Sequence, residues 1–303
     1  MPKLNVQQNN QNVIQAFKNA LAIGNLKGII ASDGSHNFST AGSNPNLLDN
    51  PWFTVRQRGD GPFTTADTVG IDRWKTNGSS GSVTGNSGYV SVSNAAGATF
   101  YQRLRDGAVE LGETYTVSIM ENDGTISTGT IVTSTNREYV ISVGPWMFEL
   151  DARTAFAPNY RFMVYKNSAW SGNFKAMKWE KGAFSTLAND APPELSIARI
   201  PCYENHLRLK GQYAPVGYAI ALSTTLALLA IPTPVPMRIA PTPSLSGTLY
   251  FNAGTPFAIT SVQNPTLGVN QVMIQVVGTF DTGKVYLAQF RDANSYLDLS
   301  ADL

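Results

Sequence analysis

TYTVSIM, residues 114–120, decides the fold class, because polar and apolar side chains alternate along it. A period of two is typical of a strand that buries one face in a hydrophobic core. Six more segments carry this period or are rich in β-branched and aromatic residues, with turn-forming residues between most of them. They are residues 88–93, 98–104, 128–134, 138–144, 160–166 and 174–182. With residues 52–58 they give eight predicted strands in about 140 residues, the size of a β-sandwich or jelly roll.

A second run of strand-like segments follows a proline-rich stretch. Residues 184–201 contain three prolines and are predicted to connect two domains. Beyond them, apolar segments alternate with prolines that we place at turns or sheet edges. The predicted fold class is therefore all-β, with a jelly-roll β-sandwich over residues 46–190 and a smaller C-terminal β domain over residues 196–303.

VGYAIALSTTLALLAIPTPVP, residues 216–236, is the most apolar stretch of the chain. Ser223, Thr224 and Thr225 interrupt it and Pro232 ends it, which leaves it short of the roughly 20 residues that a membrane helix needs. We predict two buried strands around a Ser-Thr turn and no membrane insertion.

Residues 6–23 are the segment whose spacing predicts an α-helix. Ile14, Phe17 and Leu21 fall on one narrow stripe of an otherwise Gln- and Asn-rich surface. A stripe this narrow does not stabilise a free helix, so we expect it to dock on its own domain, to pack with copies of itself or to insert into a larger assembly. Residues 24–45 are rich in Gly, Ser and Asn and are predicted to be an irregular linker.

The charge balance narrows the classes of partner. Lys and Arg number 22 against 21 Asp and Glu, a net charge of +1, which lacks the basic footprint of a general nucleic-acid binder. Cys202 is the single cysteine, so no internal disulfide can form, and with His36 and His206 it is too little for a Cys/His zinc site. We expect no cofactor and no metal. His206, beside Glu204 and Arg208, is predicted to lie at a surface or an interface.

No catalytic signature is present, and we expect no enzyme. The chain has no Gly-x-Ser-x-Gly elbow, Walker loop, His-Glu-x-x-His or strand-linked Gly-x-Gly-x-x-Gly. Two carboxylates at a set separation would suffice for a glycosidase, and the candidates are Glu149 with Asp151 and Glu110 with Glu113. Three aspartates in a Gly-rich stretch could offer oxygen ligands to calcium, but without Asp-x-Asp-x-Asp spacing they are better explained as turn residues. They are Asp60, Asp67 and Asp72.

A glycan contact is the binding chemistry that the aromatic residues favour. A sugar ring packs its C–H face on an exposed aromatic side chain, while polar neighbours bind its hydroxyl groups. YKNSAWSGNF, residues 165–174, places Trp170 among small polar residues in a predicted strand connection. Trp170 with Tyr165, Asn167 and Asn173 is the candidate glycan-binding set, and a loop anchor or subunit contact is the alternative for Trp170. Trp74 and Trp179 are expected in the core, and Trp146 in the core or packed at the end of a sheet.

NLLDNPWFTVRQRG (46–59), followed by IDRW (71–74) and MKWEKGAFST (177–186), resembles a module of tail-fibre-like and other virion proteins of bacteriophages and prophages. The order Asn-Leu-Leu, aromatic, Gln-Arg-Gly, Asp-Arg-Trp and Lys-x-Glu-x-Gly carries the resemblance. PVPMRIAPTP (234–243) and the terminal YLDLSADL extend it to the end of the chain. Residues 187–215 fit least, because extra residues precede Cys202 and the Gln-Arg that follows this cysteine in the family is missing.

The resemblance implies a carbohydrate-binding-module-like jelly roll and a small β domain on a phage particle. It also implies a homotrimer, to which the apolar residues 218–231 add support, since a small domain need not bury all their faces. Residues 1–45 would attach to other virion proteins, as the N-terminal end of phage appendages commonly does. A head fibre, a tail fibre and a capsid decoration all remain compatible. Binding of host glycans, a purely structural decoration and a polysaccharide depolymerase are the alternatives for function.

Trp52 poses the question of whether the first motif is a binding edge or a structural strand. As a strand, residues 52–58 would place Phe53, Val55 and Gln57 on one face and Trp52 with the arginines on the other. That alternation alone would leave a tryptophan-arginine edge for a ligand. The resemblance indicates instead the first strand of the jelly roll, with Trp52 covered by the linker or a neighbouring subunit.

Overall fold

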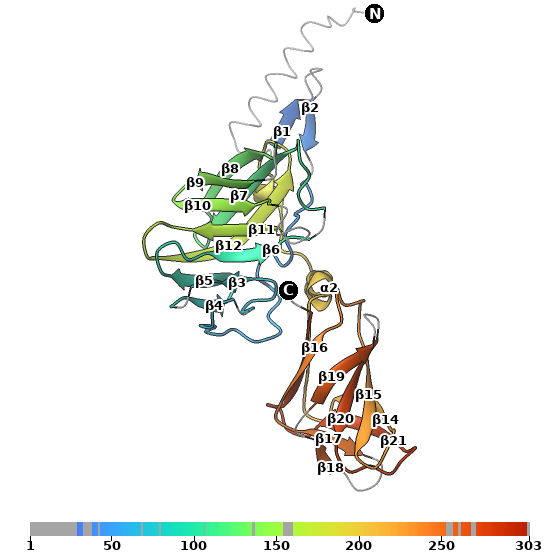
Figure 1. Ribbon diagram of the computed structural model, residues 1–303. Coiled ribbons are helices and arrows are strands. Elements are labelled where there is room, and N and C mark those ends of the chain that lie inside the picture. The colour runs from blue at the N-terminus through green and yellow to red at the C-terminus, as the bar shows by residue number, and fades with distance from the viewer. Residues whose placement is uncertain are drawn as a thin grey trace, which may run out of the picture.

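The structure is a computed structural model in which two β domains meet at a short helix (Figure 1). It describes residues 29–32, 38–41, 43–67, 69–78, 80–105, 107–134, 137–153, 160–252, 257–259, 262–267 and 271–301. The helix predicted over residues 6–23, with Ile14, Phe17 and Leu21, lies outside the described residues. The all-β fold class is confirmed, since antiparallel sheets make up both domains.

The N-terminal domain consists of two five-stranded antiparallel sheets. The first has the order β3-β6-β11-β10-β9, with β3 (Lys75–Thr76), β6 (Phe100–Arg103), β11 (Arg161–Tyr165), β10 (Trp146–Asp151) and β9 (Glu138–Val143). The second has the order β4-β5-β12-β7-β8, with β4 (Ser82–Asn86), β5 (Tyr89–Asn94), β12 (Trp170–Lys181), β7 (Thr114–Glu121) and β8 (Ile126–Val132).

Aromatic side chains fill the space between these two sheets. Phe100 of the first sheet stacks on Phe174 of the second at 6.1 Å between ring centroids, and Phe148 stacks on Trp179 at 5.7 Å. Trp74 and Trp179 are fully buried, which confirms the core placement predicted for both, and Trp146 is 2% exposed and also lies in the core. Each of the seven predicted segments from residue 88 to residue 182 contains a strand, because alternation and β-branching report directly on a half-buried sheet.

Residues 52–58 are not a strand, which corrects the prediction made for the first motif. Asn50 and Phe53 adopt positive φ angles of 47° and 54°, so the chain turns instead of extending. The Asn50 side chain closes this turn by donating to the Val55 carbonyl and accepting from the Val55 amide, both at 3.0 Å. Trp52 is 7% exposed and packs with Met120, Ala176 and Leu187 of its own domain, so no linker or second subunit is needed to cover it.

The linker expected to be irregular also contains strands. β1 (Ile29–Ser32) and β2 (Phe38–Ala41) pair with each other in an antiparallel register. Gly and Ser between short apolar runs hid this pairing from a composition-based prediction. Residues 43 and 44 then attach the segment to the N-terminal domain, where Lys178 Nζ donates to Ser43 Oγ at 2.8 Å.

The C-terminal domain combines a three-stranded and a seven-stranded sheet. The smaller has the order β13-β22-β16, with β13 (His206–Lys210), β22 (Tyr296–Ser300) and β16 (Thr242–Ser246). The larger has the order β18-β17-β21-β14-β15-β20-β19. Its strands are β18 (Phe257–Ile259), β17 (Leu249–Asn252), β21 (Val285–Phe290), β14 (Pro215–Ala221), β15 (Leu226–Pro232), β20 (Gln271–Val277) and β19 (Val262–Leu267).

Residues 216–236 form the predicted hairpin, since β14 pairs with β15 around the Ser-Thr turn. Both strands are buried on one face only, as expected for a small domain that need not bury every face of so apolar a segment. Tyr218 and Ile220 lie on the outer face and are 63% and 51% exposed. Across the sheet, Ile220 is opposite Val285, itself 56% exposed, so the outer face of this sheet is apolar and open. No helix in the described residues is long and apolar enough to span a membrane.

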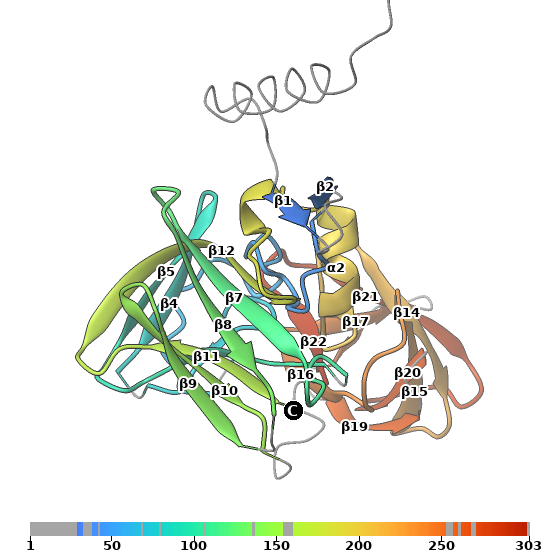
Figure 2. The same cartoon turned by 90° about the horizontal axis from the view of Figure 1, so that it is seen from above.

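Helix α2 (Leu195–Tyr203) stands at the joint between the domains, where the sequence predicted an interdomain connection without a helix (Figure 1). Ala198 and Cys202, four residues apart, lie on one helical face and pack on Val55 of the N-terminal domain. Pro201 concealed the helix from sequence reasoning, because proline normally ends a helical pattern. Here it lies in the last turn and the helix stops two residues later. Figure 2 shows the helix seated between the two groups of sheets.

Candidate functional site

The four residues predicted to bind a glycan do not converge on one surface. Trp170 begins β12 and is 6% exposed, and its indole N–H donates to the Ala98 carbonyl at 3.1 Å. Its ring lies 5.5 Å from that of Trp146, inside the core. Because β12 alternates, Trp170 and Phe174 both point inward. A sugar cannot stack on a buried ring, so the prediction that Trp170 is exposed is wrong. Its burial supports the alternative, in which Trp170 anchors the connection.

The polar members of that set point elsewhere. Asn173 lies on the outer face of β12, where its side-chain oxygen accepts a hydrogen bond from Ser91 Oγ at 2.7 Å. Asn167 is exposed in the connection between β11 and β12. Tyr165 ends β11, which belongs to the opposite sheet. The signal that misled the prediction is local composition, since small polar neighbours in the sequence do not determine which face of a strand carries the tryptophan.

Asp151, one of the candidate catalytic carboxylates, is occupied by ion pairs with two arginines. Asp151 is fully buried, and Arg153 Nε donates to it at 2.7 Å while Arg161 Nη2 lies 3.1 Å away. Burial opposes ionisation of Asp151, but these hydrogen bonds outweigh it and lower the pKa. Burial raises the pKa of Glu149, with the neighbouring Glu138 and Asp151 adding to the effect.

The other acidic candidates are also engaged with separate partners. Glu110 and Glu113 share Lys181 on the surface, at 3.3 and 2.8 Å. The three aspartates considered as calcium ligands bind different groups: Arg56 for Asp60, the Tyr101 hydroxyl for Asp67 and the Gln57 backbone amide for Asp72. Among the described residues, no three His, Cys, Asp or Glu side chains come together in a way that could hold a metal ion.

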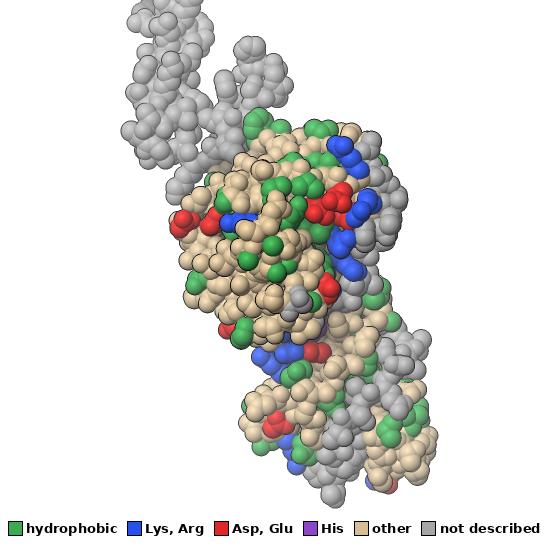
Figure 3. Space-filling view, turned by 60° about the vertical axis from the view of Figure 1, so that its left-hand side comes forward, with side chains coloured by type: hydrophobic (Ala, Val, Ile, Leu, Met, Phe, Trp, Pro, Cys, Tyr) green, Lys and Arg blue, Asp and Glu red, His purple; other side chains and the backbone are tan. Residues whose placement is uncertain are grey.

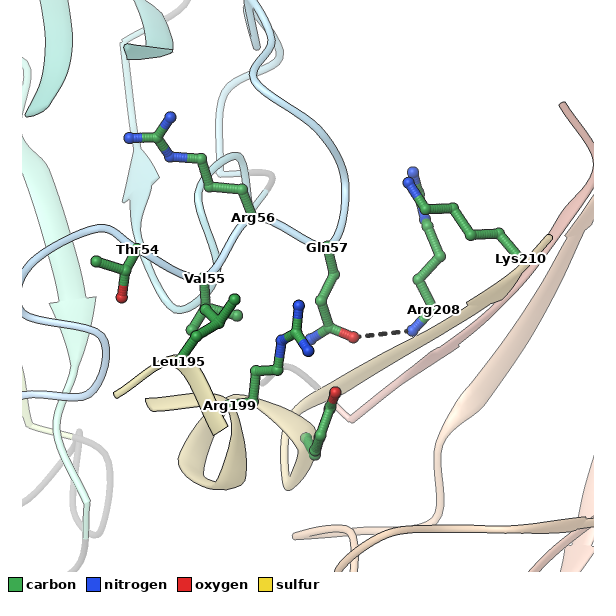
Figure 4. Close-up of a pocket in the computed structure, with 9 residues that line it drawn as sticks. Thr54, Val55, Arg56, Gln57, Leu195, Arg199, Arg208 and Lys210 are labelled. Carbon is green, nitrogen blue, oxygen red and sulfur yellow. Dashed lines mark hydrogen bonds between the residues drawn. The ribbon is translucent and has the colours of Figure 1, made fainter. Parts of the chain in front are cut away.

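A cleft of about 350 Å³ opens at the joint between the domains (Figure 4). Its volume is at the lower end of the range for small-molecule sites, about 300–1,000 Å³. We call it the joint cleft and define it by its nine lining residues, which are Thr54, Val55, Arg56, Gln57, Leu195, Arg199, Tyr203, Arg208 and Lys210.

Three local structures build the joint cleft. The turn that follows Asn50 supplies residues 54–57 from the N-terminal domain. Leu195, Arg199 and Tyr203 are four residues apart and therefore share one face of α2. Arg208 and Lys210 are two residues apart and share one face of β13, from which both side chains extend in the same direction (Figure 4).

The lining of the cleft is basic, although the chain as a whole is nearly neutral. It contains four of the 22 Lys and Arg residues and no carboxylate. Arg208 is paired with Asp298 through two hydrogen bonds of 2.7 and 2.6 Å. Arg56 extends away from α2 in Figure 4 and binds Asp60 at 3.0 Å. Arg199 and Lys210 are exposed, and in the described part of the chain neither has an ion-pair partner.

Hydrogen bonds of Gln57, next to the cleft, hold the two domains together. Gln57 donates to Asp72 Oδ1 at 2.9 Å and to the His206 carbonyl at 2.8 Å. The His206 imidazole is 2% exposed and lies between two carboxylates, 3.6 Å from Asp72 and 3.2 Å from Asp298. Burial raises the pKa of Asp298, but the hydrogen bonds from Arg208 and the proximity of the His206 ring outweigh it and lower that pKa to about 2. The histidine predicted at a surface or interface is therefore buried at the interface between the two domains.

Sequence reasoning missed the residues of the joint cleft because they come from three separate segments. Arg208 was noted only as a neighbour of His206, and Arg199 stood in a stretch predicted to connect the two domains. The i, i+4, i+8 spacing of Leu195, Arg199 and Tyr203 was the signal that could have found the helical face. No family model and no curated protein sequence matches the chain.

Proposed function

We propose that the protein is a non-enzymatic structural protein of a bacteriophage virion that displays its two β domains for attachment to host-surface glycans. Residues 1–45 would anchor it to other virion proteins, and three copies would assemble as a homotrimer. The motifs at residues 46–59, 71–74 and 177–186 support the virion role through their resemblance to phage appendage proteins. The N-terminal sandwich is proposed to be a carbohydrate-binding-module-like jelly roll for the same reason.

The joint cleft is the observation that carries the binding role. Its polar side chains supply N–H and O–H donors, which suit the hydroxyl and acidic groups of sugars, and Tyr203 adds an aromatic ring. On the face drawn in Figure 3, backbone and uncharged polar side chains cover most of the surface, and the charged side chains form a few small clusters. Such a surface offers hydrogen bonds without the long-range field of a nucleic-acid binder.

A purely structural decoration or cementing protein is the second candidate, and one observation favours it. The outer face of the seven-stranded sheet exposes Tyr218, Ile220 and Val285. An apolar face of this kind is typical of a surface that a partner covers. It would serve a decoration protein as well as a homotrimeric fibre. A depolymerase has less support, because Asp151 is committed to two arginines and cannot pair freely with Glu149.

A glycan array probed with the purified full chain tests the binding role directly. We expect a restricted set of glycans to bind, with no release of reducing ends from the same polysaccharides. Binding of no glycan, together with density for both domains on the particle in a cryo-EM map, would favour the decoration protein. Hydrolysis that one carboxylate substitution abolishes would establish an enzyme and contradict the proposal.

A further inference from the structure

We infer that the joint cleft selects an acidic saccharide unit, a sugar or sugar alcohol that carries a carboxylate or a phosphate. The inference rests on the proposed function for the saccharide, while the preference for an anion comes from the cleft itself. It names both a site and a ligand class.

Two cations of the cleft are free to meet a ligand. Arg199 enters from α2 and Lys210 from β13, so the two cations reach the cleft from different elements. Figure 4 shows the Arg199 side chain directed toward Gln57, and Lys210 alongside Arg208. An arginine fork binds the two oxygens of a carboxylate or phosphate side by side, and a lysine adds a mobile point charge.

The like charges of the cleft have a cost in the absence of ligand. Arg208 and Lys210 extend from the same face of β13, and Asp298 neutralises only Arg208, through two hydrogen bonds. An anion held between Arg199 and Lys210 would relieve this repulsion while it gained two charge-assisted hydrogen bonds. Such bonds are roughly twice as strong as those between neutral groups, so the anion would contribute most of the affinity.

The remaining lining residues fit a small polyol better than an extended polyanion. Thr54 and Tyr203 offer hydroxyl groups that both donate and accept hydrogen bonds. The space of about 350 Å³ is compact, and the net charge of +1 provides no basic track along which a nucleic-acid backbone could continue. The site is therefore suited to one acidic unit, either alone or within a longer glycan.

Titration calorimetry of the full chain with D-glucuronic acid, glycerol 3-phosphate and D-glucose tests the inference. We expect a Kd on the order of 1 mM for at least one acidic probe and no detectable binding of glucose. The double variant R199Q/K210Q should weaken acidic binding by about tenfold or more, because it removes two charge-assisted contacts. Backbone NMR shifts on α2 and β13 should accompany binding to the unmodified chain.

The control is K284Q, which removes one exposed lysine. Lys284 immediately precedes β21, pairs with Asp281 and does not line the cleft. It should bind the acidic probes normally. Arg199 and Lys210 are exposed, so the double variant should keep the melting temperature of the unmodified chain, which separates lost binding from lost folding.

The two acidic probes distinguish the source of the anion. Binding of glucuronic acid alone would assign a carboxylated sugar, and binding of glycerol phosphate alone a phosphorylated polyol. Glucose binding as tight as glucuronic acid, or acidic binding that R199Q/K210Q leaves unchanged, would overturn the inference. If the acidic probes bind in the cleft but the chain recognises no glycan on an array, the proposed function fails while the anion site stands. If array binding persists in R199Q/K210Q, the function stands and the inference fails.

Discussion

Gln57 of the N-terminal domain accepts a hydrogen bond from the backbone N–H of Arg208 in the C-terminal domain, at 3.1 Å. The same side-chain amide donates to the His206 carbonyl at 2.8 Å, so it pairs with β13 much as the backbone of a neighbouring strand would. Gln57 belongs to the first motif of the resemblance and its other partner, Asp72, to the second. These two motifs therefore build the joint between the domains.

Gln57→Ala should loosen this joint. It leaves the buried Asp72 carboxylate and the His206 carbonyl with fewer partners, and each unsatisfied buried group costs about 1–3 kcal/mol. We expect calorimetry to show a lower melting temperature and separation of the unfolding of the two domains into distinct transitions. Gln289→Ala, the same truncation on a half-buried position of β21, is the matched control and should change little. Identical transitions in the unmodified chain and Gln57→Ala would show that the joint does not couple the domains.

The lowered pKa of Asp298 predicts that the C-terminal domain loses stability in acid. Its pKa falls from 3.8 to about 2 on folding, so its carboxylate stabilises the fold above pH 3.8 and that contribution is lost as the pH falls to about 2. The loss amounts to about 2 kcal/mol. Urea unfolding between pH 5 and pH 2 should show this slope, and Asp298→Asn should remove it along with part of the stability at pH 5. Asp281→Asn, at an exposed aspartate, should keep the slope of the unmodified chain.

Trp170→Ala should lower the free energy of unfolding, because Trp170 is a core residue and not an exposed ligand contact. Removal of a buried indole from between the two sheets typically costs 3–5 kcal/mol. We expect urea unfolding to move to a lower midpoint, and Trp170→Phe to cost less because it keeps a ring beside Trp146. Asn167→Ala, three residues away in an exposed connection, should stay within about 0.5 kcal/mol of the unmodified chain. Full stability of Trp170→Ala combined with lost glycan binding would contradict the anchor role and restore the binding prediction.

Alternation along strands predicted the fold class and most strands of the N-terminal domain, because side-chain burial in a sheet has a period of two. It failed at residues 52–58, where the alternation of Phe53 and Val55 is real but φ angles of 47° at Asn50 and 54° at Phe53 turn the chain. Both side chains are buried, although residues 52–58 form no strand pairing with a neighbouring segment. The period of a short segment therefore reports which side chains are inside, and backbone hydrogen bonds decide whether they belong to a strand.

The joint cleft was beyond the reach of sequence reasoning for a different reason. Arg199 and Lys210 are eleven positions apart on a helix and a strand, and Thr54 is far upstream. The docking of α2 on Val55 and the hydrogen bonds between Gln57 and β13 bring the three together. Long-range packing of this kind leaves no local period, whereas the exposed apolar face of residues 216–236 followed from composition and domain size.

Ile220→Lys tests whether copies of the chain cover that apolar face. Ile220 is 51% exposed and lies opposite Val285 and Leu228 on neighbouring strands, so a lysine there would place a charge in the middle of an intermolecular contact. If the protein is a homotrimer, light scattering should give about three times 32.7 kDa for the unmodified chain and a smaller mass for Ile220→Lys at micromolar concentration. Val140→Lys makes the same change at a 45% exposed valine of the N-terminal domain and should leave the mass unaltered. A monomeric unmodified chain would refute the trimer, and a trimer that survives Ile220→Lys would place its interface on another surface.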